Sequence, residues 1–64
     1  MNWIHWFKRY ETETQAVFIV NQLVEYYLED NYEIVEYSIF KTKKGEFRIK
    51  YIVEAYSPLK TKEL

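Results

Sequence analysis

The residues best suited to chemistry in this chain are the bases that surround a predicted turn. Lys43, Lys44, Arg48 and Lys50 lie in one short stretch, and Phe40 precedes them. Ammonium and guanidinium groups bind phosphate oxygens, and an aromatic ring can add a stacking surface. The pattern therefore predicts a site for a small anionic ligand such as a nucleotide. It lacks the glycines of a P-loop, and an ordinary charged turn that keeps a hairpin soluble is the alternative.

No other residues form a catalytic or metal-binding pattern. His5 is the only imidazole, and neither Ser38 nor Ser57 is accompanied by a recognisable base and a third orienting group. The single histidine has no ligand spacing typical of a metal site. Glu25 and Glu29 are typical of a solvated helix face instead of an acid and base pair. We therefore expect a protein that is not an enzyme, with no catalytic residue, cofactor or metal.

Acidic and basic residues are separated along the chain. Residues 11–40 contain seven acids and no Lys or Arg, whereas residues 41–50 contain five bases and one acid. Such a surface can be complementary to a partner or to a second copy of the chain. The acidic part would repel a nucleic-acid duplex, so duplex binding is not expected.

The length of 64 residues predicts a single domain with a small core. A domain of this size buries only about 60% of the surface that its unfolded chain exposes. Small domains gain stability from disulfides, metals or self-association, and the chain has no cysteine, so we expect a homo-oligomer. No apolar stretch approaches the roughly 20 residues that cross a bilayer, which predicts a soluble, cytoplasmic protein without a membrane partner.

The clearest element is a β-hairpin formed by residues 33–41 and 46–57. Both segments are rich in Ile, Val, Tyr and Phe, and Gly45 suits the left-handed position of a three-residue loop. This loop would place Thr42 opposite Glu46. The register then pairs apolar residues on one face, namely Ile39 with Ile49, Tyr37 with Tyr51 and Val35 with Val53.

The opposite face of the hairpin is predicted to carry an apolar patch. In the same register Ile34 lies across from Glu54, Ile34 and Ile52 are diagonal neighbours, and Tyr32 and Tyr56 close the same end. A patch of four apolar side chains would mark a subunit or partner interface. Scattered exposed apolar residues, which soluble proteins tolerate, are the alternative.

Residues 13–29 are predicted to form an amphipathic helix. Thr12 and Gln15 have the spacing of a capping box, and apolar residues recur every three or four positions. These apolar positions spread over roughly 200° of the helix, which is more than one sheet face can cover. Phe18 falls among the polar residues, where it is either a contact residue or an isolated exposed side chain.

Residues 3–8 alternate in a way that favours a short strand, with a short amphipathic helix over residues 3–9 as the alternative. A hairpin alone is rarely stable, so a third strand beside it is expected. The chain is therefore predicted to be an α+β domain of β-α-β-β order over residues 1–57, with a helix packed on one face of a three-stranded sheet. Pro58 ends the last strand, and residues 58–64 form a polar tail.

This order of elements resembles the small β-α-β-β sporulation proteins and their phage relatives in Gram-positive bacteria. The resemblance rests on an acidic-capped helix and a strand reading Glu-Ile-Val-Glu-Tyr-Ser-Ile over residues 33–39, followed by a polar turn and an apolar last strand. It implies an accessory protein of a bacterium or a phage, not an enzyme.

Three functions fit these patterns. The first is a non-catalytic accessory protein that self-associates and inhibits or sequesters a host protein, with Trp3, Trp6 and Phe18 as aromatic anchors. The second is an oligomeric binder that sequesters a nucleotide-like anion through the basic residues. The third is a structural oligomer in which acidic helices meet basic hairpins.

Overall fold

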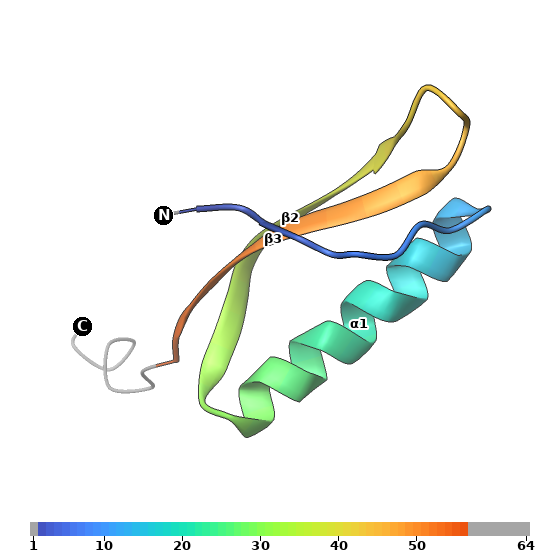
Figure 1. Ribbon diagram of the computed structural model, residues 1–64. Coiled ribbons are helices and arrows are strands. Elements are labelled where there is room, and N and C mark those ends of the chain that lie inside the picture. Colours follow the sequence, from blue (N-terminus) through green and yellow to red (C-terminus); the bar gives the residue numbers. More distant parts are fainter. Residues whose placement is uncertain (1, 57–64) are drawn as a thin grey trace.

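The computed structural model describes residues 2–56, and the predicted tail, residues 58–64, lies outside the described part. The elements follow one another as β1 (Ile4–His5), α1 (Glu13–Glu29), β2 (Tyr32–Lys41) and β3 (Phe47–Ala55) (Figure 1). Both strand pairs are antiparallel, and the sheet order is β1-β3-β2. The predicted β-α-β-β fold of the α+β class is therefore confirmed.

The hairpin turn has the predicted geometry. Thr42 donates its N–H to the Glu46 carbonyl at 2.7 Å, and Gly45 donates its N–H to the Thr42 carbonyl at 2.9 Å. The Glu46 N–H donates to the Thr42 hydroxyl at 3.2 Å. Gly45 has a φ of 86°, a left-handed value that glycine adopts without steric cost. From this turn the register pairs Ile39 with Ile49 and Tyr37 with Tyr51, as predicted.

Further from the turn the predicted register is wrong, because β2 contains an irregularity at Val35. Glu36 still lies opposite Ile52, but Ile34 lies opposite Val53 and not opposite Glu54. One extra residue in a strand reverses the faces of all residues beyond it. Ile34 consequently packs against the core on the helix side, whereas Val35 is 44% exposed.

Helix α1 has the predicted bounds and the predicted cap. Thr12 accepts the Gln15 N–H at 3.2 Å, and the Gln15 side chain accepts the Thr12 N–H at 3.3 Å. This reciprocal pair is a capping box, which satisfies backbone donors at the first turn. The cap also fixes the direction in which the chain enters the helix after Tyr10.

The first segment follows the edge of β3, so the alternative of a short helix over residues 3–9 is wrong. Strand β1 is shorter than predicted, with Ile4 opposite Tyr51 and His5 opposite Lys50. The pairing nevertheless continues beyond it, because Trp6 donates its N–H to the Ile49 carbonyl at 2.9 Å. Tyr10 forms a further bridge with Phe47.

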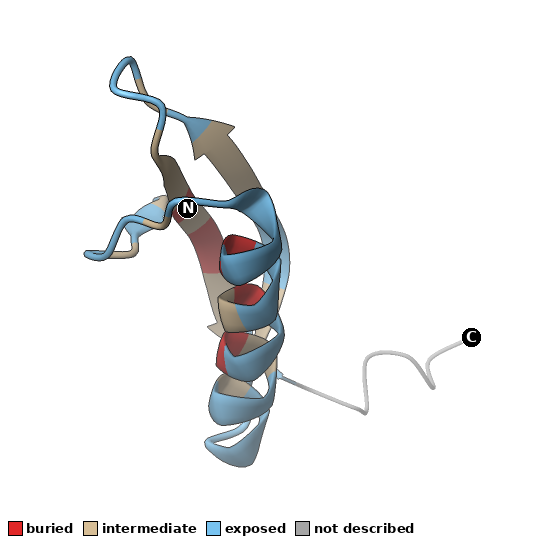
Figure 2. Cartoon of the chain, turned by 90° about the vertical axis from the view of Figure 1, so that its right-hand side faces the viewer, coloured by how far each residue is buried: buried red, intermediate tan, exposed pale blue. Residues whose placement is uncertain are grey.

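The core lies between α1 and the sheet (Figure 2). Its buried members are Ala16, Val20 and Leu23 from the helix and Ile49 and Tyr51 from β3. The Tyr27 and Tyr51 hydroxyls share a hydrogen bond of 3.0 Å at one end of this layer. No helix in the described residues is long and apolar enough to cross a membrane.

Candidate functional site

Three of the predicted basic residues line one pocket at the turn of the hairpin. Lys43, Lys44 and Arg48 contribute to it, and Arg9 joins them from the segment that runs beside β3. The pocket has a volume of about 230 Å³ and is completed by Thr42 and Glu46. We call it the basic pocket. Four cations face one carboxylate there, so its field attracts anions.

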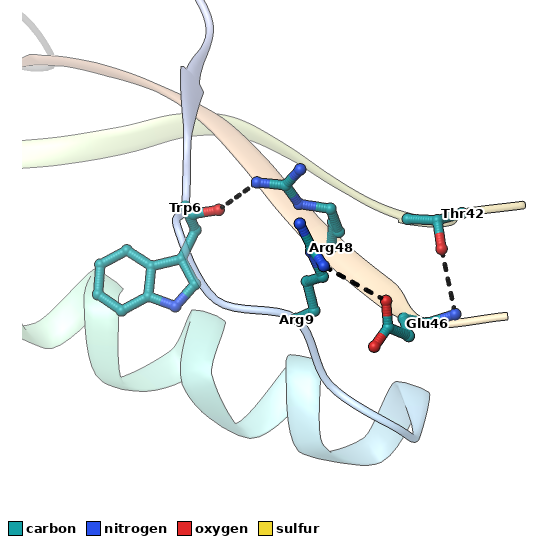
Figure 3. A network of polar contacts seen from close by, with 5 residues as sticks. All are labelled: Trp6, Arg9, Thr42, Glu46 and Arg48. Atoms are coloured by element: carbon teal, nitrogen blue, oxygen red, sulfur yellow. Dashed lines mark hydrogen bonds and ion pairs between the residues drawn. The ribbon is translucent and has the colours of Figure 1, made fainter. Parts of the chain in front are cut away.

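Arg48 is the best-fixed cation of the basic pocket. One of its terminal nitrogens, Nη2, donates to the Trp6 carbonyl at 3.2 Å, which ties β3 to the first segment (Figure 3). Its Nε is buried and has no hydrogen-bond partner among the described residues. A guanidinium presents five donors in a rigid plane, and the Trp6 carbonyl accepts one of them, so Arg48 retains donors on its terminal nitrogens that an anion can use.

Arg9 is held more loosely. Its Nη1 lies 3.8 Å from a Glu46 carboxylate oxygen, and both side chains are substantially exposed. Exposed ion pairs of this kind contribute between roughly 0 and 1 kcal/mol. Glu46 can therefore leave Arg9 at little cost when another anion arrives.

Lys50 and Phe40, the other two predicted ligand residues, do not line the basic pocket. The Lys50 ammonium lies 4.7 Å from the centre of the Trp3 ring and 5.8 Å from the centre of the Phe40 ring. These three residues form a cation-π cluster on the sheet face that points away from α1. The predicted stacking surface beside the bases is thus occupied by Lys50.

A second concave surface lies along α1 on the side of the first segment. Its larger pocket has a volume of about 540 Å³, and a neighbouring pocket of about 430 Å³ shares Ile19 with it. We call the two together the helix-side groove. It is lined by Trp6, Tyr10, Thr14, Gln15, Phe18, Ile19, Gln22, Leu23, Tyr26 and Tyr27.

Aromatic side chains dominate the rim of the helix-side groove. Phe18 and Tyr26 are each 61% exposed, and Phe7, whose ring lies next to that of Trp6, is 73% exposed. Trp6 is fixed, because its indole N–H donates to the Tyr10 hydroxyl at 2.9 Å and its ring lies 5.0 Å from the Phe7 ring. The exposed position predicted for Phe18 is confirmed, and it is continuous with other apolar side chains.

The predicted patch of Ile34, Ile52, Tyr32 and Tyr56 does not form. Ile34 faces the helix because of the irregularity at Val35, and Ile52 is only 8% exposed on the other face. Tyr32 and Tyr56 are 46% and 42% exposed. The prediction that these four gather on one face is therefore wrong, and a role for the two exposed tyrosines in an interface stays a prediction.

Sequence reasoning missed Arg9 and Tyr26 as members of these surfaces. Arg9 reaches the basic pocket only because the first segment follows β3, and no local pattern predicts that contact. Tyr26 follows Phe18 and Gln22 at helical spacing, so a stripe on this side of the helix was a readable signal.

The described residues include no group of three or more His, Cys, Asp or Glu side chains that could hold a metal ion. Among the residues that the structure describes, Tyr51 is the one strongly perturbed titratable group. Burial is the main cause that raises the pKa of its hydroxyl well above the ordinary value of 10.0, and its hydrogen bond to Tyr27 adds to the effect. Tyr51 belongs to the core and lines neither surface.

Comparison with protein-family models, curated proteins and solved structures finds no match to this chain. The resemblance to the small sporulation proteins stays a prediction.

Proposed function

We propose that this chain is a non-catalytic accessory protein that self-associates and sequesters a protein partner. The observation that carries the proposal is the helix-side groove, in which aromatic side chains surround two adjoining hollows. Exposed aromatic residues around pockets dominate the energetics of protein interfaces. Trp6 supplies a rigid wall, while Phe18 and Tyr26 supply exposed rings that a partner can cover.

The charge of α1 defines the chemistry of the partner. The groove runs along a helix that carries Glu13, Glu25 and Glu29 and has no Lys or Arg. A complementary partner presents apolar side chains that enter the groove and basic side chains that flank them. We therefore assign the groove to a basic, amphipathic segment of another protein.

The balance between buried and exposed apolar residues supports self-association. Six apolar residues of the described chain are buried, whereas ten large apolar residues are exposed. Three of the exposed side chains, Tyr32, Val35 and Tyr37, belong to β2, which is an edge strand. An edge strand offers unpaired backbone donors and acceptors to a second chain. This edge is separate from the helix-side groove, so both contacts can form together.

A peptide selection tests the partner surface. Random peptides are selected against the full chain, and the affinities of the selected peptides are measured for Phe18→Asp and for Val17→Asp. Val17 is the matched control, because it is the neighbouring helix residue, is 41% exposed and does not line the groove.

We expect the selected peptides to combine aromatic or aliphatic residues with Lys or Arg. Phe18→Asp should weaken their binding by about tenfold or more, as truncation of an interface anchor does, and Val17→Asp should change it little. Equal binding by the wild type and Phe18→Asp, or a selection that yields no binding peptide, would overturn the assignment of the groove.

A further inference from the structure

The basic pocket is not used by the proposed protein contact. It lies at the turn of the hairpin, whereas the helix-side groove lies along α1, and the two share no lining residue. Cations reach it from two separate parts of the chain, Arg9 before the helix and Lys43, Lys44 and Arg48 after it. Folding thus brings like charges together, which costs energy unless an anion compensates for them.

We infer that the basic pocket binds the phosphate or diphosphate group of a small molecule. Arg48 is already oriented, because Nη2 is held by the Trp6 carbonyl and Nε is buried without a partner in the described structure. A planar guanidinium matches phosphate oxygens with two parallel hydrogen bonds. Lys43 and Lys44 add two compact positive charges on long, flexible side chains to the lining of the pocket.

Glu46 acts as an internal competitor for the ligand. Its carboxylate lies 3.8 Å from Arg9 and occupies part of the same charged site in the free protein. A phosphate carries more charge than a carboxylate and three acceptor oxygens, so it replaces Glu46 at Arg9. The exposed ion pair is weak, which keeps the cost of this exchange low.

The size of the basic pocket implies that it recognises only the phosphate end of a ligand. Pockets that enclose a drug-sized ligand measure roughly 300 to 1,000 Å³, whereas the basic pocket measures about 230 Å³. Phe40, which lies opposite Arg48 in the sheet, is a candidate for base stacking, but it does not line the pocket and the Lys50 ammonium lies 5.8 Å from its ring centre. A nucleoside attached to the phosphate therefore remains outside the pocket and adds little affinity.

Isothermal titration calorimetry of the full chain at low salt tests the inference. The ligands are inorganic phosphate, pyrophosphate, ATP and, as a non-phosphate anion, acetate. The variants are Arg9→Gln, its matched control Lys8→Gln, and Glu46→Gln. Lys8 precedes Arg9, carries the same charge and does not line the pocket.

We expect pyrophosphate and ATP to bind with similar affinity, inorganic phosphate to bind more weakly and acetate not to bind. Arg9→Gln should weaken pyrophosphate binding by about tenfold, the effect of one lost charged hydrogen bond, and Lys8→Gln should change it little. Glu46→Gln should strengthen binding, because it removes the competitor without removing a cation.

Three results would overturn the inference. The first is an absence of pyrophosphate and ATP binding to the wild type. The second is equal weakening by Arg9→Gln and Lys8→Gln, which would indicate general charge attraction. The third is weaker binding by Glu46→Gln. Glu46→Gln also keeps the test valid if Arg9→Gln lowers the stability of the fold, since the two variants have opposite expected effects.

Discussion

Tyr51 shows most clearly how burial in the core changes the acidity of a side chain. Its side chain is 3% exposed, its hydroxyl lies 3.0 Å from the Tyr27 hydroxyl, and the two ring centres are 5.8 Å apart. A phenolate at this position would lose hydration and would lie beside the Tyr27 hydroxyl. Burial first, and then the contact with Tyr27, raises the pKa of Tyr51 well above 10.0.

This raised pKa predicts that the protein loses stability in alkaline solution. Below pH 10 both the folded and the unfolded chain keep the Tyr51 proton, so the contribution to stability is fully present. Above that pH the unfolded chain releases the proton and the folded chain does not, so the free energy of unfolding falls as pH rises toward the folded pKa. Urea unfolding measured at intervals between pH 8 and pH 11 follows this loss.

Tyr51→Phe separates the tyrosine effect from the titration of lysines. We expect this variant to be less stable at pH 8, by about 1 kcal/mol for the lost hydrogen bond. Its stability should then decline less steeply than that of the wild type above pH 10. Parallel curves for the two proteins would contradict the assigned cause.

At the scale of the element, the capping box shows how local sequence positions a functional surface. Thr12 and Gln15 satisfy backbone N–H donors at the start of α1. Gln15 also lines the helix-side groove, so the cap holds one end of the groove in place. Thr12→Ala removes the hydroxyl acceptor, and we expect a loss of about 1 kcal/mol in the free energy of unfolding.

Thr12→Ser is the control for this substitution, because it keeps the hydroxyl and should keep most of the stability. Urea unfolding monitored by circular dichroism gives both values at one pH. If Thr12→Ala and Thr12→Ser are equally stable, the hydroxyl contributes nothing and the cap is not what fixes the start of α1.

The same element scale shows where sequence patterns are sufficient and where they fail. The helix bounds and the hairpin turn depend on short-range features, namely the Thr12 to Gln15 spacing and Gly45, and both were predictable. The irregularity at Val35 was not, because Ile34 and Val35 are both apolar and either can face the core. Packing against α1 selects Ile34, and that choice requires the assembled fold.

The candidate sites also combine features that are visible in the local sequence with features that require the assembled fold. Lys43, Lys44 and Arg48 share a pocket because they surround one turn, which the sequence makes visible. Lys50 lies on the same sheet face as Arg48, but it contacts Trp3, which arrives from the other end of the chain. The approach of Trp3 and Arg9 to β3 depends on long-range strand pairing, so the separation of Lys50 from the pocket could not be predicted.

For the whole molecule, the decisive feature is that one long edge of the sheet lacks a neighbouring strand in the described chain. Strand β1 partly covers one side of β3, whereas β2 forms the other edge along its full length. Thr42 donates toward β3, so strand alternation turns the N–H groups of Lys41, Ile39 and Tyr37 to the outer edge. Tyr37 stands near the middle of this edge and is 52% exposed.

The proposed self-association therefore predicts that two copies pair their β2 strands in an antiparallel manner around Tyr37. Tyr37→Pro tests this directly, because proline removes an N–H that points away from β3 and leaves the hairpin hydrogen bonds in place. Tyr37→Thr is the matched control, since it shortens the side chain but keeps the backbone donor. Native mass spectrometry of the three proteins, with circular dichroism to verify folding, measures the number of subunits.

We expect the wild type and Tyr37→Thr to be oligomeric and Tyr37→Pro to be a folded monomer. A Tyr37→Pro protein that is folded and keeps the wild-type mass would show that the copies meet elsewhere, and a monomeric wild type would remove self-association altogether. The distinction matters for the helix-side groove, because pairing through β2 leaves it open on every copy. An assembly built in this way would offer a partner several equivalent grooves, and the gain in apparent affinity should disappear with Tyr37→Pro.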